Sequence, residues 1–408
     1  MPRPTKYHLA SDAPADTFAQ EFERLPIQEL AYRSRNVEAD RVQHILGQGR
    51  AESLEDFAAL LSPKASESLE LLAAQSQQLT QRFFGKAVRL FAPLYLSNEC
   101  VNICTYCGFS RNNDIPRITI PESLVEEQVA KLARQGFRSL LLVAGEHPKY
   151  VSNGYVESCI RRSLEHMPGI SIELGPMEAD EYKPLVQSGA EALIVYQETY
   201  HRPTYESLHK AGPKKYYAWR QDTPERGYAA GFRRLGIGAL FGLYDWRYEA
   251  VSVAAHAQYL LRKCWKSQVS ISLPRMRPAA GEFQPDPSFF ISDREMVQLI
   301  CALRLFLPHL GITLSTREPS HLRDGLVPLG ITLMSAGSST EPGGYDHFDE
   351  TQWTSTEDQP GEQFQIADER APREIASMIR AQGYEAVWKD HDQALAISSE
   401  PAQLAQIG

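Results

Sequence analysis

Three cysteines stand close together in this chain, at Cys100, Cys104 and Cys107, in the spacing Cys-x3-Cys-x2-Cys. Thiolates are soft ligands, and zinc or iron sites take four donors. This stretch supplies three donors, and no further cysteine or histidine follows at the spacing of a zinc finger. The pattern therefore favours a [4Fe-4S] cluster with one iron left free of protein over a structural zinc site.

The elements that must position these cysteines follow a regular pattern. Short apolar runs rich in Val, Ile, Leu and Tyr alternate with helix-length amphipathic segments, which is typical of βα units and a parallel sheet. The eight runs cover residues 88–97, 139–145, 170–175, 191–197, 236–243, 269–275, 312–316 and 331–336. Eight such units predict an α/β fold, a (β/α)8 TIM-type barrel.

Segments with other patterns flank the predicted barrel. Residues 1–86 carry apolar residues at helical spacing and predict an N-terminal helical extension. We expect the barrel to occupy residues 87–340. Residues 341–408, rich in Gly, Pro, Asp and Glu before a single helix at 372–383, are expected to form an appendage that caps the barrel mouth.

Composition narrows the class of protein. A net charge of −9 disfavours a nucleic-acid surface, and no stretch approaches the roughly 18 apolar residues of a membrane span. Six cysteines in 408 residues do not resemble a disulfide framework, and the N-terminus carries no signal peptide, so we expect a cytoplasmic protein. Cys159, Cys264 and Cys301 are expected to be buried helix residues, and the pairs Lys214–Lys215 and Arg233–Arg234 to be solvated surface.

Polar residues follow several of the apolar runs. In (β/α)8 barrels the chemistry gathers at the carboxyl ends of the strands, so these residues become the candidates. They are Ser97 to Cys100, Gly145 to His147, Gln197 to Tyr200, Pro274 with Arg275, Ser315 to Glu318, and Ser335 to Ser339.

The cysteine motif, with the aromatic Tyr106 before its last cysteine, resembles the signature of the radical S-adenosylmethionine (SAM) enzymes. The resemblance implies that Cys100, Cys104 and Cys107 hold a [4Fe-4S] cluster whose free iron binds the amino and carboxylate groups of SAM. An electron from the cluster then splits SAM into methionine and a 5′-deoxyadenosyl radical. The cofactors carry the chemistry, and the protein orients them and excludes water.

Other strand ends match the same family pattern, and the resemblance assigns them to the cofactor site. It implies that Gly145 and Glu146 bind the SAM amino group, that Glu198 and Thr199 reach its ribose and methionine parts, and that Arg220 binds its carboxylate. Gly238, within the glycine-rich segment 236–242, is expected beside the adenine, and Tyr106 and Gly108 are expected beside the cluster.

Within this superfamily, most of the chain resembles the aromatic amino acid lyases. The segments that carry the likeness are "LYLSNECVNICTYCGFS", "LLLVAGEHP", "VYQETYHRPTY", "SLPRMRP", "STREP" and "PGGY". They point to the tyrosine lyases of thiamine thiazole synthesis, which break the Cα–Cβ bond of L-tyrosine to give 2-iminoacetate (dehydroglycine) and p-cresol. The resemblance further implies a flavodoxin or ferredoxin as electron donor and thiazole synthase as the recipient of the product.

Three alternatives stay open. A tryptophan lyase that forms 3-methylindolic acid shares the barrel and the arginine anchor. The tyrosine lyase of [FeFe]-hydrogenase maturation holds a second cluster through cysteines near its C-terminus, whereas no cysteine follows Cys301 here. An iron–sulfur scaffold or electron carrier would need none of the SAM-binding residues.

Arg317 is our candidate anchor for the substrate carboxylate, because a guanidinium binds a carboxylate at two points and fixes its rotation. Ser315 and Ser335 would add hydrogen bonds, and the structural alternative for Arg317 is a salt bridge with Glu318. The group that handles the amine proton is left open among Tyr95, Glu198 and Arg275. Asp390 and Asp392, on either side of His391, either close over the barrel mouth or form a solvated end.

Overall fold

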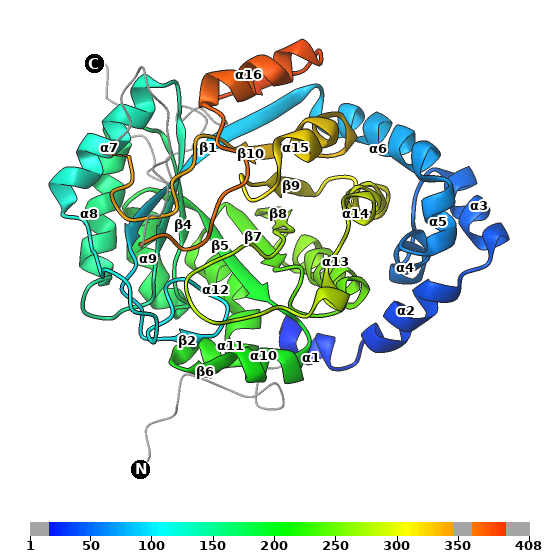
Figure 1. The fold of residues 1–408 in the computed structure, drawn as a ribbon, viewed down its shortest axis with the longest axis horizontal. Helices are drawn as coiled ribbons and strands as arrows, with labels where there is room; N and C mark the ends of the chain where they lie inside the picture. Colours follow the sequence, from blue (N-terminus) through cyan, green and yellow to red (C-terminus); the bar gives the residue numbers. More distant parts are fainter. Residues whose placement is uncertain (1–15, 346–360, 389–408) are drawn as a thin grey trace, which may run out of the picture.

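The computed structural model describes residues 16–345 and 361–388, and its centre is a closed barrel of parallel strands (Figure 1). The barrel strands are β1 (Ala87–Ser97), β3 (Ser139–Ala144), β4 (Gly169–Glu173), β5 (Ala190–Glu198), β7 (Arg234–Ala239), β8 (Gln268–Ser272), β9 (Gly311–Leu314) and β10 (Leu333–Ser335). Strand β10 pairs with β1, with Met334 opposite Leu90, and this pairing closes the ring. Each predicted run forms one of these strands, so the predicted barrel is confirmed.

Helices surround the barrel on its outside (Figure 1). They are α7 (Glu122–Arg134), α8 (Asn153–Leu164), α9 (Ala179–Gln187), α12 (Thr223–Ala230), α13 (Trp246–Lys263), α14 (Asp293–Phe306) and α15 (Ser320–Leu326). Helix α7 shows how the sequence sets them: Val125, Val129 and Leu132 are buried on one face at helical spacing. The chain turns after it at Gly136, whose φ of 109° suits glycine.

The N-terminal helices cover one side of this outer layer. They are α1 (Phe18–Phe22), α2 (Ile27–Arg33), α3 (Ala39–Gln48), α4 (Leu54–Leu60), α5 (Pro63–Glu67) and α6 (Leu69–Phe84). Helices α2 and α4 pack against α13, and α4 and α6 pack against α14, as the blue helices of Figure 1 show. Their apolar faces join the same hydrophobic core as the barrel.

The connection between β5 and β7 is the most elaborate of the barrel. It contains α10 (Arg202–Leu208), β6 (His209–Ala211), a short 3-10 turn at Pro213–Lys215 and α11 (Tyr217–Gln221) before α12. Strand β6 pairs antiparallel with β2 (Ile103–Cys104), which lies in the cysteine stretch. This connection therefore reaches across the carboxyl end of the barrel to the cysteines.

The described part of the C-terminal region contacts both ends of the barrel. Gln363 and Phe364 line a cavity at the carboxyl ends of the strands. Helix α16 (Pro372–Ala381) then leads to β11 (Glu385–Val387), which pairs with the opposite end of β1 at Ala87–Arg89. Asp390, His391 and Asp392 lie outside the described residues.

Two interior glycines make room for large neighbours in the barrel. A Cβ on Gly236 would stand 2.5 Å from the Ile194 side chain, and one on Gly238 would stand 2.7 Å from the Tyr196 ring. Both large side chains come from the neighbouring strand β5, which pairs with β7 in this register. The glycines therefore let β5 fill the barrel centre, and packed layers of this kind are expected in such barrels.

Candidate active site

The cysteine stretch leaves the carboxyl end of β1 and is fixed by a dense set of hydrogen bonds. Cys104 pairs with His209 through the β2–β6 ladder. The amide of Asn102 donates to the Glu146 carboxylate at 2.8 Å, and its oxygen accepts the Lys214 backbone N–H at 2.9 Å. Arg117 donates to four backbone carbonyls between residues 98 and 113. These bonds tie the loop to Glu146 and to the connection after β5.

Cys100, Cys104 and Cys107 line one cavity at the carboxyl end of the barrel. Gly145, Glu146, Glu198 and Arg220, all assigned to SAM from the sequence, line the same cavity. A Cβ on Gly145 would stand 2.3 Å from the Glu99 carbonyl oxygen, so only glycine lets the two loops meet there. The structure thus brings together the three thiols and four of the predicted cofactor residues.

The spacing of the three sulfurs fits a cluster better than a single ion. Ligands around one tetrahedral zinc lie about 3.8 Å apart, given a metal–sulfur distance of roughly 2.3 Å. In the described part of the chain, the groups whose ligand atoms all come within 4.8 Å of one another do not include these cysteines. A cubane cluster binds each thiolate through a different iron, so its thiolates lie further apart than the ligands of one ion.

The charges around the thiols fit a negatively charged cluster. Burial raises the pKa of the Cys104 and Cys107 thiols, and Lys214 opposes that rise. Lys214 was expected on the solvated surface, and this expectation is wrong: its ammonium lies inside the site, 2.6 Å from a Glu198 oxygen. Its neighbour Lys215 is exposed as expected. Loading of metal would release the thiol protons, since thiolates are the ligands.

Glu198 occupies a strained position at the end of β5. Its φ is 71°, a left-handed value rare outside glycine, and the register of β5 against β7 shifts between Tyr196 and Glu198. Its carboxylate lies 2.6 Å from Lys214 and 3.6 Å from Arg220. Burial alone would raise the pKa of Glu198, but the two cations outweigh burial and hold that pKa below its usual range.

Thr199 does not line the cavity of the three thiols. Its side chain is fully buried and its hydroxyl donates to the Glu249 carboxylate of α13, which also accepts the Tyr200 backbone N–H at 2.8 Å. We expected Thr199 to contact SAM directly. The structure instead gives it a role in holding the loop behind Glu198, since strained residues persist only where their surroundings fix them.

Three further predicted cofactor residues line no part of the cavity of the thiols. Gly108 faces the C-terminal segment, because a Cβ there would stand 2.6 Å from the carbonyl oxygens of Glu362 and Gln363. Gly238 faces Tyr196 within the barrel and lines neither site cavity. Tyr106 packs against Cys104 and Cys107, forms a hydrogen bond with His209 at 2.9 Å, and lines the neighbouring cavity, which Cys107 also lines.

A second cavity adjoins the first and holds the predicted substrate residues. Arg317, Ser315 and Ser335 line it, together with Tyr95 and the C-terminal Phe364. Ser315 accepts the backbone N–H of Arg317 at 3.4 Å, and Ser335 accepts that of Thr316 at 3.1 Å, so both hydroxyl protons remain available. The two cavities share six residues, which are Cys107, Val143, Glu173, Glu198, Lys214 and Gln363.

The guanidinium of Arg317 has no carboxylate partner among the described residues. The alternative of a salt bridge with Glu318 is excluded, because Glu318 pairs with Arg275. Arg275 also binds Asp293 at 2.7 Å, so it is held away from the cavity and is not available for the amine proton. Instead, Arg317 stacks on the Phe364 ring at 3.2 Å, which leaves its N–H edge for a ligand.

Sequence reasoning missed Glu173, Asn102 and Gln363. Glu173 ends β4 and lines both cavities, and its charged side chain within the apolar run 170–175 was the available signal. Asn102 lies between two of the cysteines. Gln363 accepts a hydrogen bond from the Tyr95 hydroxyl at 2.9 Å. Its position far along the chain gave no indication of this contact.

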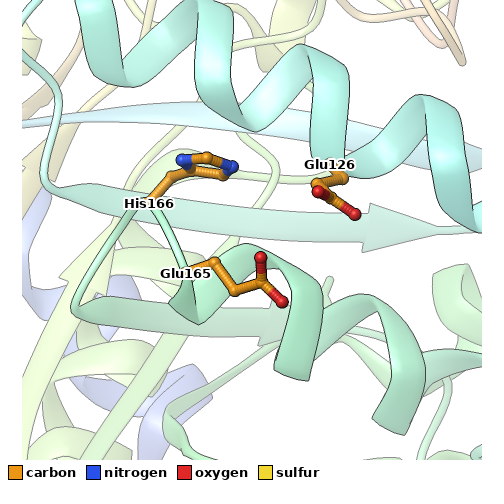
Figure 2. A group of neighbouring side chains, drawn as sticks. All are labelled: Glu126, Glu165 and His166. Atoms are coloured by element: carbon orange, nitrogen blue, oxygen red, sulfur yellow. The ribbon is translucent and has the colours of Figure 1, made fainter.

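Two other features of the molecule lie apart from the thiols. A larger cavity of about 560 Å³ lies deeper in the barrel, but none of the cysteines lines it. Figure 2 shows Glu126, Glu165 and His166, whose ligand atoms lie within 4.8 Å of one another. Glu126 is paired there with Arg162 at 2.8 Å, so the group is part of a surface ion-pair network. Cys159, Cys264 and Cys301 are fully buried, with Cys264 directly after α13 rather than inside it.

A closed eight-stranded parallel barrel, with three cysteines gathered in one cavity beyond its first strand, defines the class of radical SAM enzymes. Residues 272–385 match the Biotin and Thiamin Synthesis associated domain family. The chain belongs to the 2-iminoacetate synthase family of radical SAM lyases. It is 40% identical to 2-iminoacetate synthase of Escherichia coli (strain K12) over 386 residues, which cover 94% of this chain and 99% of that protein.

Further comparisons agree with this family. The identity to 2-iminoacetate synthase of Salmonella typhimurium is 38% over the same coverage. Among solved structures, HydG, a maturase of the [FeFe]-hydrogenase, superposes with a TM-score of 0.81 at 29% identity, over 89% of this chain and 79% of that chain. Methylornithine synthase (PylB) shares the fold, with a TM-score of 0.65 at 21% identity. No helix in the described residues is long and apolar enough to cross a membrane.

Proposed function

We propose that this protein cleaves the Cα–Cβ bond of L-tyrosine to give 2-iminoacetate and p-cresol for thiamine thiazole synthesis. The observation that carries the proposal is the adjacency of the two cavities. One is lined by the three thiols and the other by an arginine that has no carboxylate partner among residues 16–345 and 361–388, and they share Cys107. An amino acid held by Arg317 would therefore lie directly beside the cofactor cavity.

The residues of the first cavity suit a [4Fe-4S] cluster and SAM. The three cysteines would hold the cluster, and Glu146 would accept the SAM ammonium while Arg220 binds its carboxylate. Arg220 already donates through Nε to the Tyr196 carbonyl at 2.6 Å, which orients its remaining N–H groups. When bound, the cluster and SAM supply the radical that removes a hydrogen atom from the tyrosine amino group.

The residues of the second cavity would bind and orient tyrosine. Arg317 would hold the carboxylate at two points, and the hydroxyls of Ser315 and Ser335 would donate to it. Phe364 and Gln363 come from the C-terminal segment and also line this cavity. Their position would exclude water from the reacting atoms.

The test is anaerobic incubation of the reconstituted protein with SAM, dithionite and either L-tyrosine or L-tryptophan. The proposal expects p-cresol from tyrosine and 5′-deoxyadenosine in step with it. Formation of 3-methylindolic acid from tryptophan would assign the chain to the tryptophan lyases. Absence of 5′-deoxyadenosine with both substrates would leave an iron–sulfur scaffold or electron carrier.

The same proposal extends to partners and location. 2-Iminoacetate is an imine that water hydrolyses, so direct transfer to thiazole synthase is expected. A flavodoxin or ferredoxin would supply the electron. The six cysteines carry free thiols in the structure, and an iron site open to a ligand needs a reducing environment, which supports a cytoplasmic location. Cross-linking of the reconstituted protein with thiazole synthase would test the first of these expectations.

A further inference from the structure

Three carboxylates line the two site cavities, and two of them have partners. They are Glu146, Glu173 and Glu198. Glu146 accepts a hydrogen bond from Asn102 at 2.8 Å. Glu198 pairs with Lys214 and Arg220. Among the described residues, the carboxylate of Glu173 has neither a hydrogen bond nor an ion pair. The half-buried Glu173 carboxylate therefore faces the two cavities with its acceptor oxygens unused by the described protein, which points to a ligand that supplies a donor.

The position of Glu173 fits the boundary between cofactor and substrate. It is the last residue of β4 and pairs in register with Val143 of β3, whose side chain lines the same two cavities. Ser171, two residues earlier on the same face of β4, lines the deeper cavity. The alternation of the strand therefore directs Glu173 inward, at the level where the two cavities meet.

The charged and titratable groups near Glu173 explain its electrostatics. They are Tyr95 of β1, Tyr196 and Glu198 of β5, Arg317 after β9, and Arg220 and Lys214 of the connection after β5. Burial, then the charge of Glu198, raises the pKa of Glu173 to about 7, against the opposing charges of Arg317, Arg220 and Lys214. No histidine lines either cavity in the part of the chain that the structure describes.

We propose that Glu173 binds the ammonium group of the substrate and accepts its proton before the radical step. This inference rests on the proposed function and names the residue that the tyrosine lyase reaction requires for the amine. Arg317 and Glu173 then form opposite ends of one amino-acid site, since neither has an ion-pair partner in the part of the chain that the structure describes and they carry opposite charges.

The proton transfer balances as an ordinary acid–base step. One N–H bond of the substrate ammonium breaks and one O–H bond forms on Glu173, which gives a neutral amine and a neutral carboxylic acid. No electron moves in this step, and no further reactant is needed. The neutral amine is the form from which the 5′-deoxyadenosyl radical removes a hydrogen atom in the proposed reaction. A carboxylate whose pKa is raised to about 7 is a stronger base than an ordinary carboxylate, which suits this transfer.

The test compares L-tyrosine with 3-(4-hydroxyphenyl)propanoate, which keeps the phenol and the carboxylate but lacks the amine. Binding of each is measured by calorimetry to the reconstituted protein with SAM and without reductant, so that no turnover occurs. Glu173→Gln should weaken L-tyrosine about tenfold to a hundredfold and leave the deaminated compound unchanged, since only the amine loses a charged partner. Glu173→Asp should recover part of this loss. Glu165→Gln, at an exposed carboxylate before β4, is the matched control and should change neither affinity.

A second measurement follows the pH. The affinity of the unmodified protein for L-tyrosine should rise as pH increases through about 7, because Glu173 ionises there. This rise should be absent in Glu173→Gln. Iron content and SAM affinity of the variant should match those of the unmodified protein.

Several outcomes would overturn the assignment. If Glu173→Gln weakens the binding of L-tyrosine and of the deaminated compound equally, or weakens neither, Glu173 does not bind the amine. Weakened SAM binding with unchanged L-tyrosine affinity would assign Glu173 to the cofactor instead. If the unmodified protein forms no p-cresol, the proposed function fails, whereas p-cresol together with an unaffected Glu173→Gln variant defeats this inference alone.

Discussion

Glu249 is a buried carboxylate that supports the active site from behind, and its replacement by glutamine gives a quantitative prediction. It lies on α13 and has no exposed surface. It accepts hydrogen bonds from the Thr199 hydroxyl and the Tyr200 N–H, directly after the strained Glu198. Burial raises its pKa from 4.5 to about 7, against the opposing effect of these hydrogen bonds. The folded protein therefore favours the protonated form of Glu249 relative to the unfolded chain.

The sign and size of the effect follow from this shift. Between pH 4.5 and pH 7 the folded state holds a proton on Glu249 that the unfolded state has released, so stability falls as pH rises. Each pKa unit corresponds to about 1.4 kcal/mol, which gives a loss of roughly 3 kcal/mol above pH 7. The contribution of Glu249 to the free energy of unfolding is fully present below pH 4.5, the pKa of the unfolded chain. Glutamine cannot ionise and keeps one acceptor for the Tyr200 N–H, so the variant should escape the loss.

The assay is urea unfolding of both proteins at pH 5 and pH 8, anaerobically and at equal cluster loading. All other groups titrate in both proteins, so the difference between them isolates Glu249. The variant should gain about 2 to 3 kcal/mol relative to the unmodified protein between the two pH values. Glu165→Gln, at an exposed site, should show no such gain. If the stability curves of Glu249→Gln and the unmodified protein run parallel with pH, the argument from burial is refuted.

Other residues of the site give shorter predictions. Arg317→Lys should abolish p-cresol formation while leaving the absorbance and EPR spectra of the cluster intact, and undiminished turnover would discard the anchor role. Gly108→Ala places a Cβ 2.6 Å from two carbonyl oxygens of residues 362 and 363, so hydrogen exchange in that segment should accelerate, with protection unchanged if the contact is unimportant. Asn102→Ala removes the bonds to Glu146 and to the Lys214 N–H, and SAM affinity should fall about tenfold in equilibrium dialysis.

The barrel and the cysteine cavity could be predicted from sequence because their signals are local. A strand such as β3 is a continuous apolar run, and the polar residue at its end must lie at the carboxyl end of a parallel barrel. The grouping of Cys107 with Glu146 and Glu198 follows from this rule alone. The spacing of Cys100, Cys104 and Cys107 in the sequence then identifies the three thiols as one ligand group, and this step does not require the directions of their side chains.

Side-chain roles set by distant contacts could not be predicted. Lys214 lies in a basic pair, Lys214–Lys215, of the kind usually found on protein surfaces. The pairing of β2 with β6 brings this segment to the cysteine stretch, where Lys214 pairs with Glu198. Gly238 lies in a glycine-rich segment that suggests close approach of a ligand, but the Tyr196 ring of the neighbouring strand occupies the space beside it. Gln363 enters the site from a segment about 250 residues beyond Cys107, with which its amide is in contact at 4.0 Å. In each case the deciding partner lies on another strand or loop.

The charges of the site determine how an amino acid would lie within it. Glu173 lines both cavities, whereas Arg317 lines only the second. A zwitterion bound between them would turn its ammonium group toward the thiols and its carboxylate away from them. The nitrogen, from which the proposed reaction removes hydrogen, would then lie nearest the source of the radical. Exchanging the two charges would turn the amino acid around and place its carboxylate there, so this pair of residues would fix which bond of tyrosine breaks.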